Sequence, residues 1–236
     1  MAKLKMAPVI EEASGATGSS VFVPSPFGQL LRRNVRPANP NTARQQLVRA
    51  GLSQFSAQWK TISRAFQNGW RSLATTYMQS GKYGASYASS AQRLFVNLNQ
   101  NLRDIGAAQI TAPPSAVNIP PALVITAGAV VHDQSTPETS TVALTVSGLN
   151  GNGFKLFATP PLSLGRFSFG NATYRMILAD DDDGSLNTAQ ISAAYKAKFG
   201  TIPTGGRVAF KLIGVEANEG WASQPTYLDV DITTQA

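Results

Sequence analysis

Apolar residues recur at every third or fourth position between residues 48 and 77, and this pattern constrains the fold more than any other feature of the sequence. It takes eight steps to cover this stretch, an average of about 3.6 residues per step, which is the period of an α-helix. The stripe predicts amphipathic helix whose large side chains face a core. Its members are Val48, Leu52, Phe55, Trp59, Ile62, Phe66, Trp70, Leu73 and Tyr77, and we assign Phe55, Trp59, Ile62, Phe66 and Trp70 to the helical core.

Capping signals indicate where this helical stretch begins and divides. Thr42 is a good N-cap residue, and Gln45 stands at the third helical position, as a capping box requires. Ser63 is a second N-cap candidate, so we predict two helices with a corner near residues 60–63, with a single long helix as the alternative. Gly81 and Gly84 are the expected stop.

A further amphipathic segment covers residues 87–105. Leu94, Leu98, Leu102 and Ile105 lie on one stripe of it, and Gly106 follows as a helix terminator. Residues 41–106 are therefore predicted to form a small α-helical module.

Residues 1–40 show neither a helical period nor a sustained strand period. They are rich in small residues, glycine, serine and proline, so they cannot bury enough surface to fold alone. We predict an extended basic arm that lies on a partner. Within it, residues 21–24 (VFVP) could add one short strand to the edge of a neighbour's sheet.

The sequence pattern changes after a proline-rich stretch at residues 107–121, which we interpret as a semi-rigid linker. Apolar and polar residues then alternate in several short runs, as in half-buried strands. One helix is expected among them at residues 189–199, capped by Asn187 or Thr188. The alternating runs contain Val142, Leu144 and Val146; Tyr174, Met176 and Leu178; and residues 228–233.

These elements together predict an α+β multidomain protein. It would consist of the extended N-terminal arm, the small α-helical module, the linker, and a C-terminal antiparallel β-sandwich at residues 122–236. The expected sandwich is of the immunoglobulin or fibronectin type III kind, with one short inserted helix.

Charge is distributed unevenly along the chain. Residues 1–110 hold 13 Lys or Arg and 3 Asp or Glu, whereas residues 111–236 hold 7 and 10, so net charges of +10 and −3 make up the total of +7. Residues 13–103 contain no acidic residue. A field of one sign favours an anionic partner, either nucleic acid or the acidic surface of another protein.

Arginines in the arm and at the start of the first helix are the candidate contacts with that partner. Their planar guanidinium groups bind phosphate or carboxylate with two hydrogen bonds, and an extended backbone lets several reach one groove. Trp59, Phe66 and Trp70 could stack on bases, but their helical spacing favours a core. The candidate contacts are Arg32, Arg33, Arg36, Arg44 and Arg49.

No motif of an enzyme accompanies these residues. The chain has no cysteine, which excludes thiol catalysis and thiolate metal sites, and it has neither a phosphate-binding glycine loop nor a G-x-S-x-G motif. His132 is the only histidine, and we expect it in a turn at the end of a strand. We predict no enzymatic activity, no cofactor and no small-molecule substrate.

Four consecutive aspartates, Asp180, Asp181, Asp182 and Asp183, precede Gly184. The spacing does not match an EF-hand, because positions 1 and 12 of such a loop would be occupied by Ala179 and Gln190. A solvated turn before the inserted helix is the favoured interpretation, and weak cation binding stays open.

The sequence also bears on location. The N-terminal basic residues are followed by Pro8, Glu11 and Glu12, where a signal peptide needs an unbroken apolar stretch. No run approaches the roughly 20 apolar residues of a membrane span. We expect a protein without an export signal or membrane contact, made in the cytoplasm.

Two resemblances involve these residues. Residues 59–63 (WKTIS), with Trp70 and Ala74, are similar to the corner between the second and third helices of HMG boxes, which bend DNA through the minor groove. This resemblance implies nucleic-acid binding through the basic N-terminal half.

The second resemblance covers most of the chain. The sequence contains NPNTARQQLVR at residues 39–49, SAQWKTIS followed by Trp70, RLFVNLNQNLRDIG at residues 93–106, a proline-rich stretch, and AYKAKFG-x-IP-x-GGRV at residues 194–208. It resembles structural proteins encoded in tailed-phage and prophage genomes. This implies a virion protein without catalytic residues, whose partners are other virion subunits, including further copies of the chain.

Overall fold

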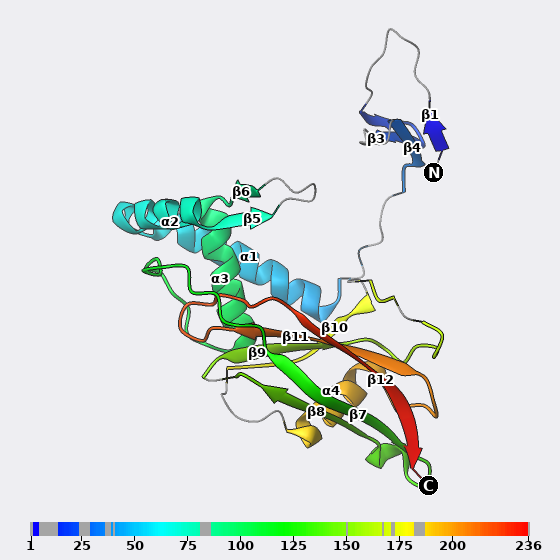
Figure 1. Cartoon of the computed structure of the whole chain (residues 1–236). Helices are drawn as coiled ribbons and strands as arrows, with labels where there is room; N and C mark the ends of the chain where they lie inside the picture. The colour runs from blue at the N-terminus through cyan, green and yellow to red at the C-terminus, as the bar shows by residue number, and fades with distance from the viewer. Residues whose placement is uncertain are drawn as a thin grey trace. The chain divides into compact units, whose positions relative to one another are not determined.

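The structure is a computed structural model that describes residues 2–4, 14–23, 29–35, 39, 41–80, 86–149, 151–166, 168–170, 173–181 and 187–235. The chain divides into two compact units, residues 1–46 and 47–236. The predicted α+β class is confirmed, because helices accompany a large mixed sheet (Figure 1).

Residues of the first unit form a four-stranded antiparallel sheet in place of the extended arm expected from the sequence. Its strands are β1 (Ala2–Leu4), β2 (Gly15–Thr17), β3 (Ser20–Val23) and β4 (Gln29–Arg33), in the order β1-β4-β3-β2. The VFV run of residues 21–23 lies in β3 and pairs within the chain, with β4 on one side and β2 on the other. Pro24 lies outside the described residues.

The helical region begins and divides as its capping residues predict. Helix α1 (Ala43–Thr61) starts with reciprocal bonds between Thr42 and Gln45: the Thr42 amide donates to Gln45 Oε1 at 3.2 Å, and the Gln45 amide donates to Thr42 Oγ1 at 3.4 Å. Helix α2 (Arg64–Thr76) follows a corner, where Ser63 Oγ accepts from the Phe66 amide at 3.3 Å. The prediction of two helices is confirmed. Gly81 and Gly84 lie outside the described residues.

A short hairpin separates α2 from the third helix. Its strands are β5 (Met78–Ser80) and β6 (Ser86–Ala88). Helix α3 (Ala91–Ile105) therefore starts later than residue 87, behind the N-cap Ser90, and ends at Gly106, whose φ of 86° is the left-handed conformation of a C-cap.

Aromatic side chains hold the helices together. The Trp70 ring meets the Phe95 ring edge to face, with centroids 5.4 Å apart, and Trp59 packs against the same phenylalanine at 5.6 Å. Residues 107–121 lie along this core: the Trp70 indole donates to the Thr111 carbonyl at 3.0 Å, and Asn99 exchanges hydrogen bonds with the Ile110 backbone. The stretch interpreted as a linker is thus packed on the helices.

The C-terminal strands form one mixed six-stranded sheet in the order β10-β9-β11-β12-β7-β8. All neighbours are antiparallel except β12 and β7, which are parallel. The predicted immunoglobulin or fibronectin type III sandwich is not confirmed, because these strands belong to one sheet. The strands are β7 (Val124–Asp133), β8 (Thr141–Ser147), β9 (Gly153–Ala158), β10 (Arg175–Asp180), β11 (Arg207–Val215) and β12 (Thr226–Gln235), with a short 3-10 turn, η1 (Pro137–Thr139), before β8.

Helix α4 (Thr188–Phe199) contacts both edge strands of this sheet, β8 and β10, so the sheet curls around one hydrophobic core and the helix lies between its edges (Figure 1). Asn187 caps the helix, as predicted, by accepting from the Ala189 amide at 2.8 Å. Ser192 Oγ accepts from the Val142 amide at 2.8 Å, so the helix satisfies a backbone group on the edge strand β8.

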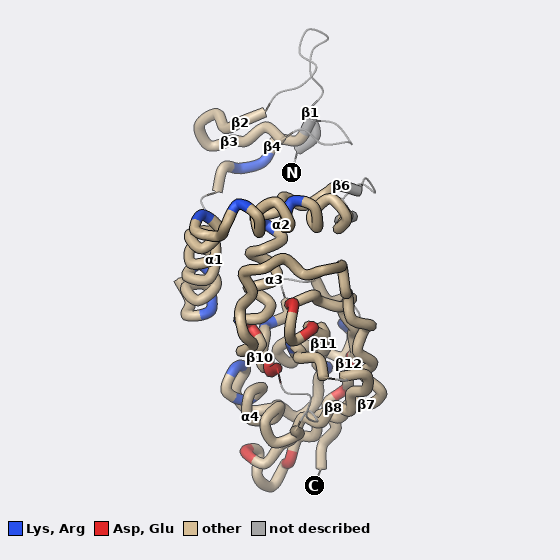
Figure 2. The backbone as a smooth tube through the Cα atoms, turned by 90° about the vertical axis from the view of Figure 1, so that its left-hand side faces the viewer, with Lys and Arg blue, Asp and Glu red and all other residues tan. Residues whose placement is uncertain are grey.

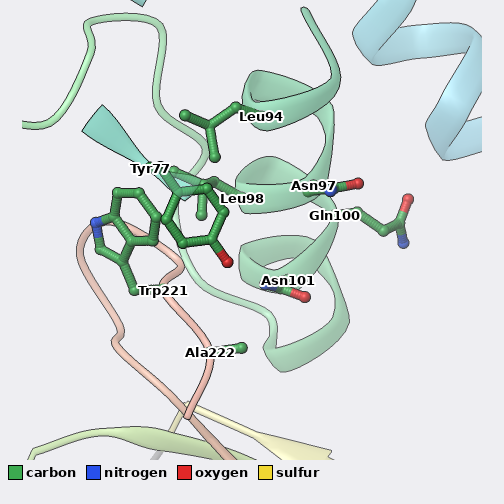
Figure 3. A pocket seen from close by; sticks show the side chains of 8 residues that line it. All are labelled: Tyr77, Leu94, Asn97, Leu98, Gln100, Asn101, Trp221 and Ala222. Atoms are coloured by element: carbon green, nitrogen blue, oxygen red, sulfur yellow. The ribbon is translucent and has the colours of Figure 1, made fainter. Parts of the chain in front are cut away.

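Helix α3 joins the helical core to the sheet. Lys155 on β9 donates to Asp104 Oδ2 at 2.9 Å and to Asn101 Oδ1 at 2.8 Å, and Asn101 in turn donates to the Gly220 carbonyl. Trp221, from the loop between β11 and β12, is buried in the helical core beside Tyr77 (Figure 3). The helices and the sheet therefore share buried contacts within the second unit.

Candidate partner-binding surfaces

Burial is described for residues 14–23, 30–35, 39 and 41–46 of the first unit, and none of these residues is buried or belongs to a core cluster. Strands β3 and β4 nevertheless carry five apolar side chains between them. Phe22 pairs with Leu31 across one face, whereas Val21 pairs with Arg32 and Val23 pairs with Leu30 on the other. Both faces of this single layer therefore combine apolar side chains with solvent exposure. We call this four-stranded sheet the N-terminal sheet.

Two of the predicted arginine contacts lie on the N-terminal sheet. Arg32 and Arg33 are consecutive, exposed residues of β4, so their side chains project from opposite faces. Whether these arginines reach one anionic groove, as the sequence suggested, stays a prediction. Arg36 lies outside the described residues.

The other two predicted arginines lie on α1. Arg44 is half-buried and Arg49 is exposed, and five helical positions place them about 140° apart around the helix axis. Arg49 instead shares a stripe with Lys60, three turns further along the helix. The spacing of eleven residues between Arg49 and Lys60, which is three helical turns, is the sequence signal for this stripe.

Exposed cations continue onto the neighbouring helices. Arg64 and Arg71 are two turns apart on one stripe of α2, and Arg93 is exposed in the first turn of α3. Figure 2 shows the Lys and Arg residues on α1 and α2, and the acidic residues that it draws lie around the six-stranded sheet and the end of α3. We call Arg49, Lys60, Arg64, Arg71 and Arg93 the basic helical surface.

The five residues predicted for the helical core differ in how deeply they are buried. Phe55 and Trp70 are fully buried, and Trp59 and Ile62 are partly buried against the same cluster. Phe66, assigned to the core from the period, is 41% exposed. Phe66 lies on the same helical stripe as Trp70 and Leu73, but it stands in the first turn of α2, and the buried residues of this helix begin only at Trp70. The burial of Trp70 also argues against a base-stacking role.

The polar residues considered for chemistry have structural partners. His132 lies within β7, next to the strand end, where its Nδ1 is 2.7 Å from the Ile202 carbonyl. Asp133 accepts hydrogen bonds from Thr139, Ser135 and Thr136, which hold the pKa of its carboxyl group well below the ordinary value. These contacts form the turn between β7 and β8.

Metal ligands do not gather in the described part of the chain, where no group of three or more His, Cys, Asp or Glu residues could hold an ion. Asp180 ends β10 and Asp181 follows it, whereas Asp182 and Asp183 lie outside the described residues. The proposal of weak cation binding there stays a prediction. Among the described helices, none is both long and apolar enough to cross a membrane.

One exposed aromatic cluster was missed by the sequence analysis. Tyr227 on β12 lies beside Tyr174, with ring centroids 6.0 Å apart, on the face of the six-stranded sheet that points away from its core. The alternation of residues 228–233 carries the signal, because it fixes which β12 side chains point outward.

Comparison with protein-family models, with curated proteins and with solved structures gives no match.

Proposed function

We propose that the protein is a non-enzymatic structural or assembly protein of a phage particle, which attaches to neighbouring subunits through its N-terminal sheet and basic helical surface. The observation that carries the proposal is the N-terminal sheet, in which none of the strand residues with described burial, within 15–17, 20–23 and 30–33, is buried. A sheet needs a second layer over at least one face, and a partner subunit would supply it. The chain's resemblance to tailed-phage structural proteins supports a virion as the setting.

Charge supports subunits with acidic surfaces as these partners. Arg32 and Arg33 belong to the N-terminal sheet, and the acid-free stretch of residues 13–103 continues through the basic helical surface. The β region of the same chain is net negative. Copies arranged head to tail, in a ring or shell, would bring surfaces of opposite charge together, so we propose that the chain is a homo-oligomer in the particle.

The curled sheet is the displayed part in this proposal. Residues of β7 and β8 share one core with residues of β9 and β11 within the single six-stranded sheet, which supports the proposal that this region acts like an immunoglobulin- or fibronectin-like sandwich. This region would face outward or pack against neighbouring subunits.

Mass spectrometry of purified particles tests the proposal. The chain should be present at a fixed ratio to the major capsid or tail protein. A full-length Arg32→Glu/Arg33→Glu variant should be incorporated poorly, because two charges on the N-terminal sheet are reversed. The matched control is Lys196→Glu/Lys198→Glu in α4, where two cations are reversed on another element. Absence of the wild-type chain from intact particles would contradict the proposal.

Nucleic-acid binding is a second candidate function, and the basic helical surface favours it. The stripes Arg49 with Lys60 and Arg64 with Arg71 could neutralise phosphates on a duplex. Binding would then weaken with salt, with a log-log slope of about 0.9 per phosphate contacted.

Salt-dependent titration with a 20-base-pair duplex distinguishes the two functions. If DNA is the partner, Arg64→Ala/Arg71→Ala should reduce the slope by about 2, since each phosphate contact contributes about 0.9. If the salt slope is unchanged in this variant, or if wild-type protein does not bind, acidic protein surfaces remain the proposed partners.

A further inference from the structure

The face of the six-stranded sheet that points away from its core is only partly covered. Along β9 the outward side chains are Lys155 and Phe157, because Phe154, Leu156 and Ala158 point into the core. Helix α3 covers the Lys155 position through Asp104 and Asn101. At Phe157, two residues further along β9, helix α3 does not cover this face.

A row of side chains crosses this uncovered part of the sheet. Phe157 on β9 pairs with Lys211 on β11, and Lys211 pairs with Tyr227 on β12. The Lys211 ammonium lies over both rings, 5.7 Å from the centroid of Phe157 and 5.8 Å from that of Tyr227. This arrangement fixes the lysine between two aromatic side chains and leaves Tyr227 52% exposed.

The loop between β9 and β10 makes a recess beside this row. Phe169, Gly170, Tyr174 and Tyr227 line a space of about 480 Å³. The two tyrosine rings are tilted by 56° with respect to each other, so they form two walls of the recess and do not stack face to face. A volume in this range is within that of small-ligand sites.

Charged groups continue from the recess along the outward side of β11 and β12. Arg207 lies 2.6 Å from Asp231 Oδ1 and 3.5 Å from Asp229 Oδ2. Asp229 keeps 55% of its side chain exposed. Burial raises the pKa of the Tyr174 hydroxyl, and the nearby Tyr227 and Asp229 raise it further, so this phenol stays a neutral hydrogen-bond donor in ordinary buffers.

None of the described residues that line the recess is charged. On the outward side of β11 and β12 next to it, the charges of Lys211 and Arg207 are balanced by those of Asp229 and Asp231, and Arg175 follows Tyr174 in the chain. A ligand that fits must offer an apolar face to the rings and both donors and acceptors to the mixed polar rim. A sugar ring has this chemistry, because its C–H groups form an apolar face and its hydroxyl groups both donate and accept.

We propose that the recess between Tyr174 and Tyr227 binds one sugar unit of a neutral carbohydrate. Tyr227 and Tyr174 contact the apolar face of the sugar, and Asp229 accepts hydrogen bonds from its hydroxyl groups. This site uses none of the residues of the N-terminal sheet or the basic helical surface, so its failure can be distinguished from failure of the proposed assembly role.

Saturation-transfer NMR and calorimetry with full-length protein test the site. The probes are maltohexaose, cellohexaose and chitohexaose, with the anionic polygalacturonate and the cationic chitosan hexamer as charged comparisons. At least one neutral probe should bind, with magnetisation transferred from the protein to the C–H protons of the sugar ring. Neither charged probe should bind more tightly than this neutral probe.

Variants identify the residues. Tyr227→Ala should weaken binding by about tenfold, which corresponds to the loss of one good ring contact. Tyr227→Phe should bind within about twofold of wild type, because it keeps the ring and its stacking contact. Phe66→Ala, which removes an exposed aromatic side chain on α2, is the matched control and should leave binding unchanged.

Three results would overturn the proposal. The first is that no neutral probe binds, and the second is that Tyr227→Ala binds as well as wild type. The third is self-association of the full chain in sedimentation velocity that is abolished by Tyr227→Ala. This result would mean that the outward face of the sheet binds a second copy of the chain.

Discussion

The two units of the chain differ in how far their described side chains are buried. The second unit contains two clusters of buried side chains, one around Trp70 and Phe95 and one inside the curled sheet. The first unit has four paired strands, yet none of its residues with described burial, within 14–23, 30–35, 39 and 41–46, is buried. Strand pairing without a covering layer supplies hydrogen bonds but little hydrophobic stabilisation. We therefore expect the second unit to be stable alone, and we propose that the first unit gains its stability from a partner.

The largest expected effect comes from breaking the ion pair inside the second unit. Lys155→Met leaves Asp104 charged and buried, which should lower the free energy of unfolding by about 3–5 kcal/mol. Chemical denaturation of the full chain measures this. The double variant Lys155→Met/Asp104→Leu should recover most of the loss, and Arg207→Met, which breaks a solvent-accessible pair, should cost much less than Lys155→Met. Equal losses for Lys155→Met and Arg207→Met would contradict the described junction.

A smaller effect is expected at the edge strand that α4 covers. Ser192→Ala removes the acceptor of the Val142 amide, which is then buried without a partner, at a cost of about 1–3 kcal/mol. The same denaturation experiment gives the value. Ser147→Ala, on the exposed side of β8, serves as the control and should change stability by less than about 0.5 kcal/mol.

Asp133 should make the second unit slightly acid-sensitive. Because hydrogen bonds depress its pKa in the folded state, its stabilising contribution is complete above the unfolded value near 4 and is lost as the pH falls further. Wild type should therefore exceed Asp133→Asn in stability at pH 7, and the difference should shrink at pH 3. Thr139→Ala, which removes the main donor, should reduce the difference at pH 7. A gap that is the same at both pH values would count against these hydrogen bonds.

The smallest effect should follow removal of residues 1–40, which include all four strands of the first unit. A chain that begins at Asn41 keeps the Thr42 cap and all of α1, so its free energy of unfolding should stay within about 1 kcal/mol of the full chain. A larger loss would mean that residues 1–40 contribute to the cores of the second unit.

Local signals predicted much of the second unit. Thr42, Ser63 and Asn187 cap helices where the sequence analysis placed them, since capping depends on bonds between residues two or three positions apart. The alternation of residues 228–233 also holds, with Leu228 and Val230 packed on the core and Asp229 exposed. These features follow from short stretches of chain.

Features that depend on contacts between distant residues were not predicted from the sequence. The parallel pairing of β12 with β7 and the packing of Trp221 among the helices join segments far apart in the chain. A register shift between Met176 and Leu178 breaks the alternation predicted for that strand, so residues expected on one face do not share it.

The candidate surfaces were predicted only in part. A bias toward Lys and Arg is visible in composition, so the acid-free half was found at once. The N-terminal sheet was missed because its strands are three to five residues long and carry little periodicity. Tyr174 and Tyr227 come from segments that only the fold brings together.

Hydrogen exchange of the purified, monomeric full-length chain tests most directly whether the first unit needs a partner. We expect amides of β3 and β4 to exchange at least about a thousandfold faster than those of β9 and β11, because only the latter lie over a buried core. Protection of β3 and β4 equal to that of β9 and β11 in the monomer would contradict the account.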